Sequence, residues 1–289
     1  MRVTLLGDVM LDVVVRPLGP SAPTSDTASQ VRVSRGGSGA NVAAGLASAG
    51  HDVTYVGACG TDAAAELWDA HARRAALTPR LERVDAPTGV VVALVGPDGQ
   101  RAMYSARGAN ALLSADFVAE ALSAPFEHLH VSGYSVLDPA TRAVAVAALA
   151  RARRAGVTSS VDVCSVAPLA EIGPSAFAGA VAGVDFLFAN EEEAALLAGA
   201  PWAEGLGALR ALAREGLLTR GPDGAVAWDA HDSVASASQR TVVLDTTGAG
   251  DAATGAYLGA RLSGLGMRES LARAMAAAAD VLGGLGASG

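Results

Sequence analysis

Short apolar stretches that alternate with helical segments are the feature that most constrains the fold of this chain. The expected strands cover residues 2–6, 53–58, 158–163, 185–189 and 217–219. Helices are expected between them, for example over residues 62–77 and 141–155. Strands that alternate with helices pair in parallel and are covered on both faces. The sequence therefore predicts an α/β fold with a doubly wound, mostly parallel sheet, whose functional residues gather at the carboxyl ends of the strands.

A second, smaller sheet is predicted from four other β segments. They cover residues 13–16, 31–34, 88–95 and 101–106. The last two flank Pro97-Asp98-Gly99, a sequence typical of a hairpin turn. We therefore expect residues 1–289 to form a single α/β domain, with a small β-sheet inserted from about residues 12–35 and 88–107.

The stretch Gly248-Ala249-Gly250-Asp251 directly precedes an apolar, alanine-rich run that is expected to be a helix. Small residues allow backbone N–H groups to converge at a helix start, where the helix dipole adds partial positive charge. The dipole is expected to keep Asp251 ionised, so that it can accept a proton from a hydroxyl. The amides would hold charge that develops on a transferred phosphoryl group. An acidic residue in the first turn of a helix is also common without any such function.

The composition excludes several classes of enzyme, because the chain contains no lysine and all of its fixed positive charge is arginine. A Walker A phosphate loop, a protein-kinase site and a pyridoxal-phosphate enzyme each require a lysine. The net charge of −8 argues against binding to nucleic acid or to an anionic membrane. No signal peptide or membrane span is recognisable, and Cys59 and Cys164 are expected to be free thiols, so we expect a cytoplasmic location.

Four motifs together resemble the signatures of one enzyme family. They are Asp245-Thr-Thr-Gly-Ala-Gly-Asp251, Gly36-Gly-Ser-Gly-Ala-Asn41, Asn190-Glu-Glu-Glu193 and Thr219-Arg-Gly-Pro-Asp-Gly224. Their types and order are similar to those of the ribokinase-like (PfkB) carbohydrate kinases, over essentially the whole chain. The resemblance implies a ribokinase-like fold with the small sheet as a lid over the sugar. It also implies ATP-dependent transfer of the γ-phosphate to a hydroxyl of a small carbohydrate.

The resemblance implies a role for individual residues as well. Asp251 would deprotonate the sugar hydroxyl, and the amides of Gly248, Ala249 and Gly250 would form the anion hole. The implied acceptor-binding residues are Asp12, Gly37, Ser38 and Asn41. The implied nucleotide-binding residues are Asn190, Thr219, Gly221, Gly224 and Thr246. Glu193 would organise Mg²⁺ through water, and Asp245 and Thr247 match part of a monovalent-cation site for K⁺. Dimers through the lid are common in the family, so a homodimer is expected.

Residues outside the four motifs are open to more than one interpretation. Tyr104 and Arg107 lie at the end of the predicted hairpin, from where they could reach an acceptor that carries a carboxylate or a phosphate. An exposed arginine at a strand end is an equally good interpretation. His51 and His71 have no partner at metal-ligand spacing and are expected at the surface, whereas a packed position is expected for the histidines at 128 and 130.

The identity of the acceptor stays open at the level of the sequence. A neutral ketose or pentose, a nucleoside and a sugar acid such as 2-keto-3-deoxygluconate are all consistent with the motifs, whereas a phosphorylated sugar would need more basic residues than the lid segments show. Two other classes compete with a kinase. A binding protein without activity is disfavoured by the retained Asp251, and a dehydrogenase by the lack of a glycine fingerprint after the first strand.

Overall fold

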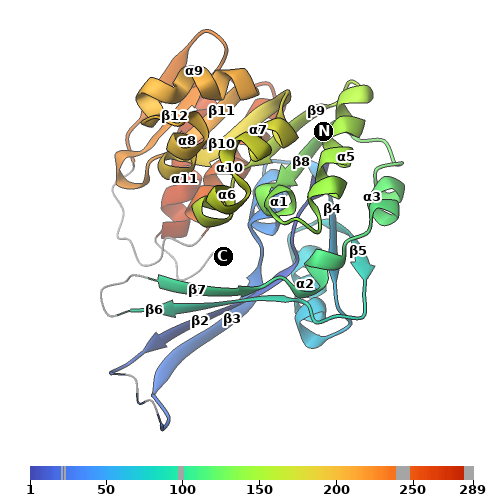
Figure 1. Cartoon of the computed structure of the whole chain (residues 1–289), viewed down its shortest axis with the longest axis vertical. Coiled ribbons are helices and arrows are strands. Elements are labelled where there is room, and N and C mark those ends of the chain that lie inside the picture. The colour runs from blue at the N-terminus through green and yellow to red at the C-terminus, as the bar shows by residue number, and fades with distance from the viewer. Residues whose placement is uncertain (21, 23, 97–100, 239–247, 283–289) are drawn as a thin grey trace.

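The computed structural model describes residues 1–20, 22, 24–96, 101–238 and 248–282. Within these ranges, nine strands form a large sheet in the order β13-β12-β11-β10-β9-β8-β1-β4-β5, in which all neighbours pair in parallel except that β12 pairs antiparallel with both β11 and β13 (Figure 1). The strands are β1 (Arg2–Leu6), β4 (Asp52–Cys59), β5 (Thr78–Arg83), β8 (His128–Ser132), β9 (Thr158–Asp162), β10 (Val184–Asn190), β11 (Ala213–Thr219), β12 (Ala225–Trp228) and β13 (Ser233–Ser236). The predicted parallel sheet is confirmed.

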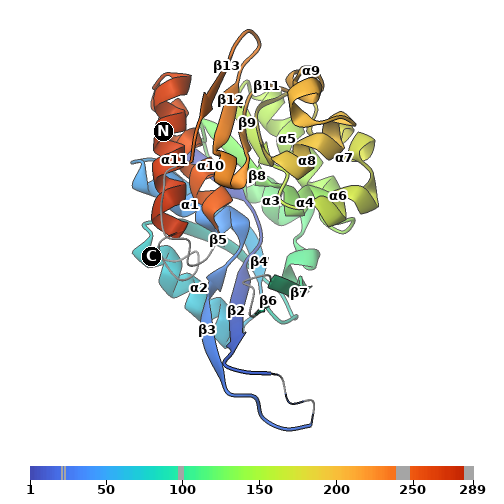
Figure 2. The same ribbon diagram turned by 90° about the vertical axis from the view of Figure 1, so that its left-hand side faces the viewer.

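Helices cover both faces of this sheet and enclose two apolar cores (Figure 2). One face carries α1 (Ser38–Ser48), α2 (Ala63–Arg74), α10 (Ala249–Leu262) and α11 (Met267–Leu282). The other carries α3 (Ala115–Ala121), α4 (Gly133–Leu137), α5 (Arg142–Arg154), α6 (Val166–Ile172), α7 (Pro174–Val181), α8 (Glu191–Ala198) and α9 (Trp202–Leu212). Two short 3₁₀ helices, η1 (Gly108–Leu112) and η2 (Gly221–Asp223), complete the described helices. None of the helices in these ranges combines the length and apolar character that crossing a bilayer demands.

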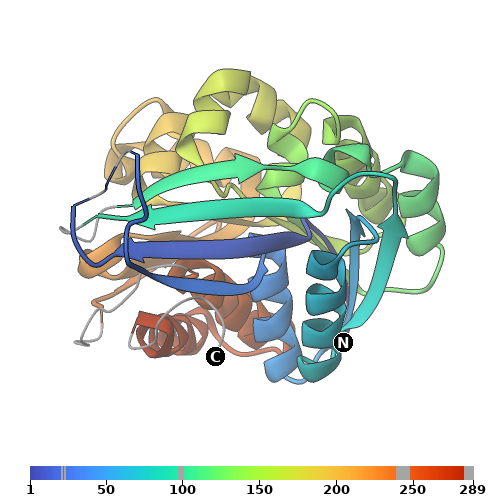
Figure 3. The same ribbon diagram turned by 90° about the horizontal axis from the view of Figure 1, so that it is seen from below.

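The second sheet extends away from the α/β body, and its strands lie side by side when viewed from below (Figure 3). Over the described residues it has the order β3-β2-β6-β7. These strands are β2 (Met10–Pro17), β3 (Ser29–Gly36), β6 (Gly89–Val95) and β7 (Arg101–Ala106). The antiparallel pairing of β6 with β7 confirms the predicted hairpin, although its turn lies outside the described residues. The small sheet predicted from the sequence is therefore present.

Polar residues occupy the carboxyl ends of adjacent strands in the large sheet, as expected for a parallel α/β fold. Ser132 at the end of β8 is in register with Asp162 at the end of β9. Asn190 at the end of β10 is likewise in register with Thr219 at the end of β11. The register thus places four polar residues at the carboxyl ends of adjacent strands, along one edge of the sheet.

The histidines of β8 belong to the interior of the large sheet. The side chains of His128 and His130 are fully buried, and each has a ring nitrogen 2.8 Å from the hydroxyl of Ser160. His51 is also buried, with Nε2 2.9 Å from the carbonyl oxygen of Gly259, so its predicted surface position is wrong. His71 is half-buried, which also corrects that prediction. The sequence could not show these positions because helix and strand neighbours from distant segments cover them.

Replacing His130 by asparagine is expected to make the protein less sensitive to mild acid. Burial lowers the pKa of His130 from 6.5 to about 3, so the unfolded chain binds this proton first as the pH falls. The histidine therefore reduces stability as the pH drops from about 6.5 towards 3, by about 1.4 kcal/mol per pH unit. In urea unfolding, the stability lost between pH 7 and pH 5 should be about 2 kcal/mol smaller in H130N. H231N, at an exposed site, is the control, and equal losses in all three proteins would contradict the assignment.

Candidate active site

Close packing of α1 against α10 brings the glycine-rich motif near residue 37 to the motif near residue 250. A Cβ atom added at Gly45 of α1 would lie 3.1 Å from the Cα atom of Gly255 in α10. A Cβ atom at Gly255 would lie 2.9 Å from the carbonyl oxygen of Val42. Glycines at both positions allow the helix backbones to approach closely. The first turns of the two helices, more than 200 residues apart in sequence, therefore meet.

Asp251 lies in the first turn of α10 and is held by two side chains of α1. The Ser38 hydroxyl donates to Oδ1 of Asp251 at 2.7 Å, and Nδ2 of Asn41 donates to Oδ2 at 2.7 Å. Burial raises the pKa of Asp251, whereas these hydrogen bonds act in the opposite direction. The helix dipole favours the ionised form of Asp251, as expected from the sequence, but burial opposes it. A carboxylate with a raised pKa is better suited to accept a proton near neutral pH.

The helix start beside Asp251 offers main-chain N–H groups to an anion. Gly248 precedes the first turn with a φ of 78°, a left-handed conformation that favours glycine, and α10 has no side-chain cap there in the described chain. The first intrahelical bond runs from the amide of Ala252 to the oxygen of Gly248, so the amides of residues 249–251 precede the helical ladder. A Cβ atom added at Gly250 would have no neighbour within 4 Å. Gly248, Ala249 and Gly250 thus lie where the sequence predicted an anion site.

Asp12 faces the glycine pair that leads from β3 into α1. A Cβ atom at Gly36 would lie 1.9 Å from Oδ1 of Asp12, so only glycine leaves room for this carboxylate. Gly37 has a φ of 105°, and a Cβ atom there would lie 2.4 Å from the carbonyl oxygen of Asp8. Burial raises the pKa of Asp12 to about 6, Arg35 lowers it and Asp251 raises it. Asp12 and Asp251 therefore border the same region, between the small sheet and α1.

Arg35 is a residue of this region that the sequence reasoning missed. Its side chain is buried, and its Nη1 donates a hydrogen bond to Oδ1 of Asn41, which in turn bonds to Asp251. Burial lowers the pKa of Arg35, while the charges of Asp12 and Asp251 favour its ionised form. The available signal was its position directly before Gly36-Gly37, because a residue there must share their approach to the site.

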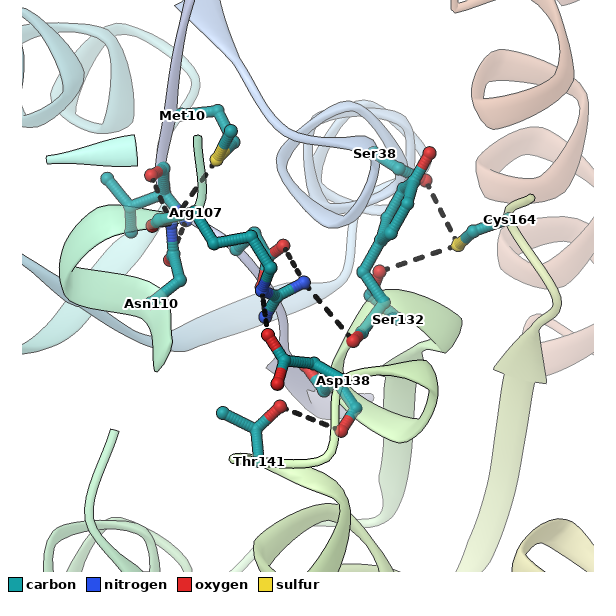
Figure 4. A network of polar contacts seen from close by, with 12 residues as sticks. Met10, Ser38, Arg107, Asn110, Ser132, Asp138, Thr141 and Cys164 are labelled. Carbon is teal, nitrogen blue, oxygen red and sulfur yellow. Dashed lines mark hydrogen bonds and ion pairs between the residues drawn. The ribbon is translucent and has the colours of Figure 1, made fainter. Parts of the chain in front are cut away.

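Arg107 lies at the base of the small sheet, between two carboxylates (Figure 4). Its Nη1 lies 2.8 Å from Oδ2 of Asp8, its Nη2 donates to Oδ1 of Asp8 at 3.0 Å, and its Nε lies 2.5 Å from Oδ2 of Asp138. Arg107 is therefore half-buried and paired, so the interpretation that it is an exposed arginine at a strand end is wrong. Tyr104, its predicted companion, is 61% exposed on β7.

Asn110 connects Val9, just before β2, with Arg107, just after β7, through hydrogen bonds to the main chain. Its Oδ1 accepts from the amide of Val9 at 2.8 Å, and its Nδ2 donates to the carbonyl oxygens of Val9 and Arg107 at 2.9 Å each.

The Sγ atom of Cys164 lies 3.5 Å from the hydroxyl of Ser132 and 3.8 Å from that of Ser38 (Figure 4). Cys164, with an unusual φ of 74°, thus borders the region around Asp251, which the sequence did not indicate.

The predicted nucleotide and metal residues form a second group at the ends of β10 and β11. Asn190 and Glu193 make a capping box: the Glu193 amide donates to Oδ1 of Asn190 at 2.8 Å, and the Asn190 amide donates to Oε2 of Glu193 at 2.9 Å. Thr219 is the register partner of Asn190, and the turn after it contains Gly221 and Gly224, both with positive φ. Asp245, Thr246 and Thr247 lie outside the described residues.

Asp162 connects this group electrostatically with Asp251. Burial raises the pKa of Asp162 well above its usual range, and the charges of Glu193 and Asp251 raise it further. Burial also raises the pKa of Glu193 to about 7. Three carboxyl groups therefore share one region without being arranged as direct ligands, because no cluster of three or more metal-ligating residues occurs in the described ranges. Such a region suits a cation that keeps its waters.

A carboxylate beside an uncapped helix start, at the edge of a parallel sheet, is an arrangement that suits phosphoryl transfer. The chain belongs to the pfkB family of carbohydrate kinases, because the model of that family matches residues 2–289.

Three known proteins, one compared by sequence and two by structure, are similar to this chain over nearly its whole length. An ATP-dependent ribose-1-phosphate kinase from Halopiger xanaduensis is 29% identical, and the alignment covers 99% of this chain and 93% of that protein. A ribokinase II candidate from E. coli, solved with ATP and Mg²⁺, has a TM-score of 0.88 at 20% identity, with 99% and 94% of the two chains covered. Adenosine kinase from Sinorhizobium meliloti has a TM-score of 0.84 at 23% identity, with 99% and 95% covered. These structures share the fold.

Proposed function

We propose that this protein transfers the γ-phosphate of ATP to a hydroxyl group of a small carbohydrate, with Asp251 as the general base. The observation that carries the proposal is the position of Asp251. It is fixed by Ser38 and Asn41 at the start of α10, beside amides that precede the helical ladder. Proton removal and stabilisation of the transferred group would then occur within one helical turn.

In the proposed reaction, residues of this chain bind the acceptor, remove its proton and stabilise the transferred phosphoryl group, in that order. Asp12, Gly37, Ser38 and Asn41 would bind the acceptor so that one hydroxyl points at the Asp251 carboxylate. Asp251 takes the hydroxyl proton as the oxygen attacks the γ-phosphorus atom, and ADP leaves with the bonding electron pair. The amides of Gly248, Ala249 and Gly250 stabilise the charge on the transferred group. Closure of the small sheet as a lid would exclude water, which competes as an acceptor.

Nucleotide and Mg²⁺ are assigned to the second group of residues. The ATP in the E. coli structure and the ATP dependence of the Halopiger kinase support ATP as the donor. Asn190, Thr219, Gly221 and Gly224 would line its binding region, together with Thr246. Glu193 fits a magnesium ion held through water, because its carboxyl group is buried, which raises its pKa, and the charges of Asp251 and Glu192 raise that pKa further. The bound ion would neutralise phosphate charge. A K⁺ site at Asp245 and Thr247, a homodimer through the lid and a cytoplasmic location stay predictions.

The experiment that tests the proposal is a coupled assay of ADP release with wild-type protein, ATP and Mg²⁺. The acceptor panel contains neutral pentoses and ketoses, their phosphate esters, adenosine and 2-keto-3-deoxygluconate. At least one acceptor should give ADP release well above the rate without acceptor, with one phosphorylated product per ADP. ADP release that is independent of every acceptor would favour the alternative, a protein that binds sugar or nucleotide without turnover.

Replacing Gly36 by alanine is expected to raise the KM for the acceptor by about tenfold or more. The new methyl group would occupy the place of the Asp12 carboxylate, whose Oδ1 lies 1.9 Å from the Cβ position, so Asp12 must move away. The KM for ATP should change much less. Gly19→Ala is the matched control, because a Cβ atom there has no neighbour within 4 Å. An unchanged acceptor KM in G36A would remove Asp12 from the acceptor site.

A further inference from the structure

A cavity of about 740 Å³ opens beside the proposed active site. Its walls come from β3 of the small sheet, the flanks of α1 and α2, and the facing sides of α10 and α11. Asn41, which bonds to Asp251, and Gly248 of the anion site line its inner part. A molecule in this cavity would therefore reach the general base with one end and extend towards α2 with the other.

Three of the residues that line the cavity are arginines. Arg32 and Arg35 contribute from β3, and Arg74 contributes from the last turn of α2. The only acidic side chain among the described lining residues is Asp280, on α11. The net charge of the whole chain is −8, so a cluster of three arginines on one cavity is a local reversal of the protein's overall charge.

Arg35 is the deepest of these groups and is incompletely bonded. Only 7% of its surface is exposed, its one hydrogen-bond partner in the described chain is the neutral amide oxygen of Asn41, and its Nε is buried without a partner. Nε2 of His71, another lining atom, is likewise buried without a partner in the described ranges. The charges of Asp12 and Asp251 favour the ionised form of Arg35, but they leave its Nε without a hydrogen-bond acceptor among the described residues, and buried polar atoms without hydrogen bonds are rare. These unsatisfied groups point to a missing anionic ligand.

The geometry points to a phosphate-binding subsite formed by Arg35, His71 and Arg74, which selects a phosphorylated sugar as the acceptor. This inference rests on the proposed kinase function and names its substrate class. Two guanidinium groups and an imidazole offer more donors than a carboxylate can use, whereas a phosphate ester carries about two negative charges and three terminal oxygens. Asn41, which bonds to Asp251, and the α2 residues His71 and Arg74 line the same cavity, so the phosphate would lie towards α2 and the reacting hydroxyl towards Asp251.

The lid segments alone contain too few basic residues for a phosphorylated acceptor, but His71 and Arg74 of α2 add to them in the folded protein. Burial together with the charges of Arg35 and Arg74 lowers the pKa of His71 to about 4, which shows that all three groups share one electrostatic environment. They lie on β3 and α2, which are separated by α1 and β4 in the chain. Folding therefore assembles a subsite that no single motif contains.

Kinetics with matched acceptor pairs test the subsite. Ribose 1-phosphate, ribose 5-phosphate, fructose 1-phosphate and fructose 6-phosphate are each compared with the neutral sugar. The wild type should prefer one phosphorylated sugar, and Arg74→Gln should reduce that preference, as a ratio of kcat/KM values, by about tenfold. Arg73→Gln is the matched control, since Arg73 is the neighbouring residue on α2, is exposed like Arg74 and is not among the residues that line the cavity. A change confined to the KM for ATP, or preference for a neutral acceptor in the wild type, would overturn the inference.

Phosphate binding without turnover separates this inference from the proposed function. Inorganic phosphate should raise the Tm of the wild type and R73Q in a concentration-dependent way, and clearly less in R74Q. Equal shifts in all three proteins would place the anion elsewhere and overturn the subsite, even if the protein proves to be a sugar kinase. A shift lost only in R74Q, with no acceptor phosphorylated, would retain the anion site and reject the proposed reaction instead.

Discussion

Replacing Asp251 by asparagine is expected to lower kcat by about two to four decades while acceptor binding is retained. Asparagine keeps the size of the side chain and can still accept the hydrogen bond from Ser38, but it cannot take a proton from the acceptor hydroxyl. The KM for ATP should change little, because the main-chain amides at the start of α10 are preserved. Steady-state kinetics and calorimetric binding of the acceptor measure the two effects separately.

The control for this variant is Asp116→Asn, an exposed acidic residue in the first turn of α3. It should retain wild-type turnover, which would show that the loss in D251N is specific to the site. The wild-type rate should also fall as the pH drops through the raised pKa of Asp251, because the base must be deprotonated. This acid limb should disappear in D251N. If D251N turns over at the wild-type rate, another group removes the proton and the mechanism is wrong.

Replacing Arg107 by glutamine is expected to lower the free energy of unfolding by about 3 kcal/mol. Arg107 contacts Asp8 through two nitrogens and Asp138 through a third, and its removal leaves both carboxylates without their cation. Asp8 is only 7% exposed, and burial raises its pKa even though Arg107 lowers it. The small sheet should also be held less firmly, because Arg107 directly follows β7. Urea unfolding at pH 7 measures the loss.

Two further variants distinguish a buried pair from an ordinary surface contact. Arg80→Gln removes an ion pair with Glu120 at 3.1 Å, whose side chains are 46% and 73% exposed, and should cost at most about 1 kcal/mol. Asp8→Asn in the R107Q background should recover part of the lost stability, since it removes the unpaired buried charge. If R107Q loses no more free energy of unfolding than R80Q, the inference that Asp8 and Asp138 hold Arg107 at the base of the small sheet is wrong.

Local sequence patterns predicted the elements of this fold better than they predicted its side-chain environments. The helix predicted over residues 141–155 and the strand ends near Asn190 and Thr219 follow from apolar runs and their boundaries, which act over a few residues. The surface prediction for His51 failed because its cover comes from Gly259, about 200 residues away. Arg35 bonds to the nearby Asn41, but the link from Asn41 to Asp251 spans about 200 residues and was not visible in the sequence.

The sequence by itself determined the α/β fold class, the small sheet and the group of motifs that includes Asp251, Ser38 and Asn41. These depend on periodicity and on short glycine-rich signatures, which are properties of adjacent residues. Only the tertiary structure decided which residues meet. Asp251 accepts hydrogen bonds from two residues of α1, and Arg107 forms ion pairs with Asp8 and Asp138. Arg35 and Arg74 line the same cavity. Burial and electrostatic fields arise from contacts between distant segments, so charge states and ligand subsites exist only once the chain has packed.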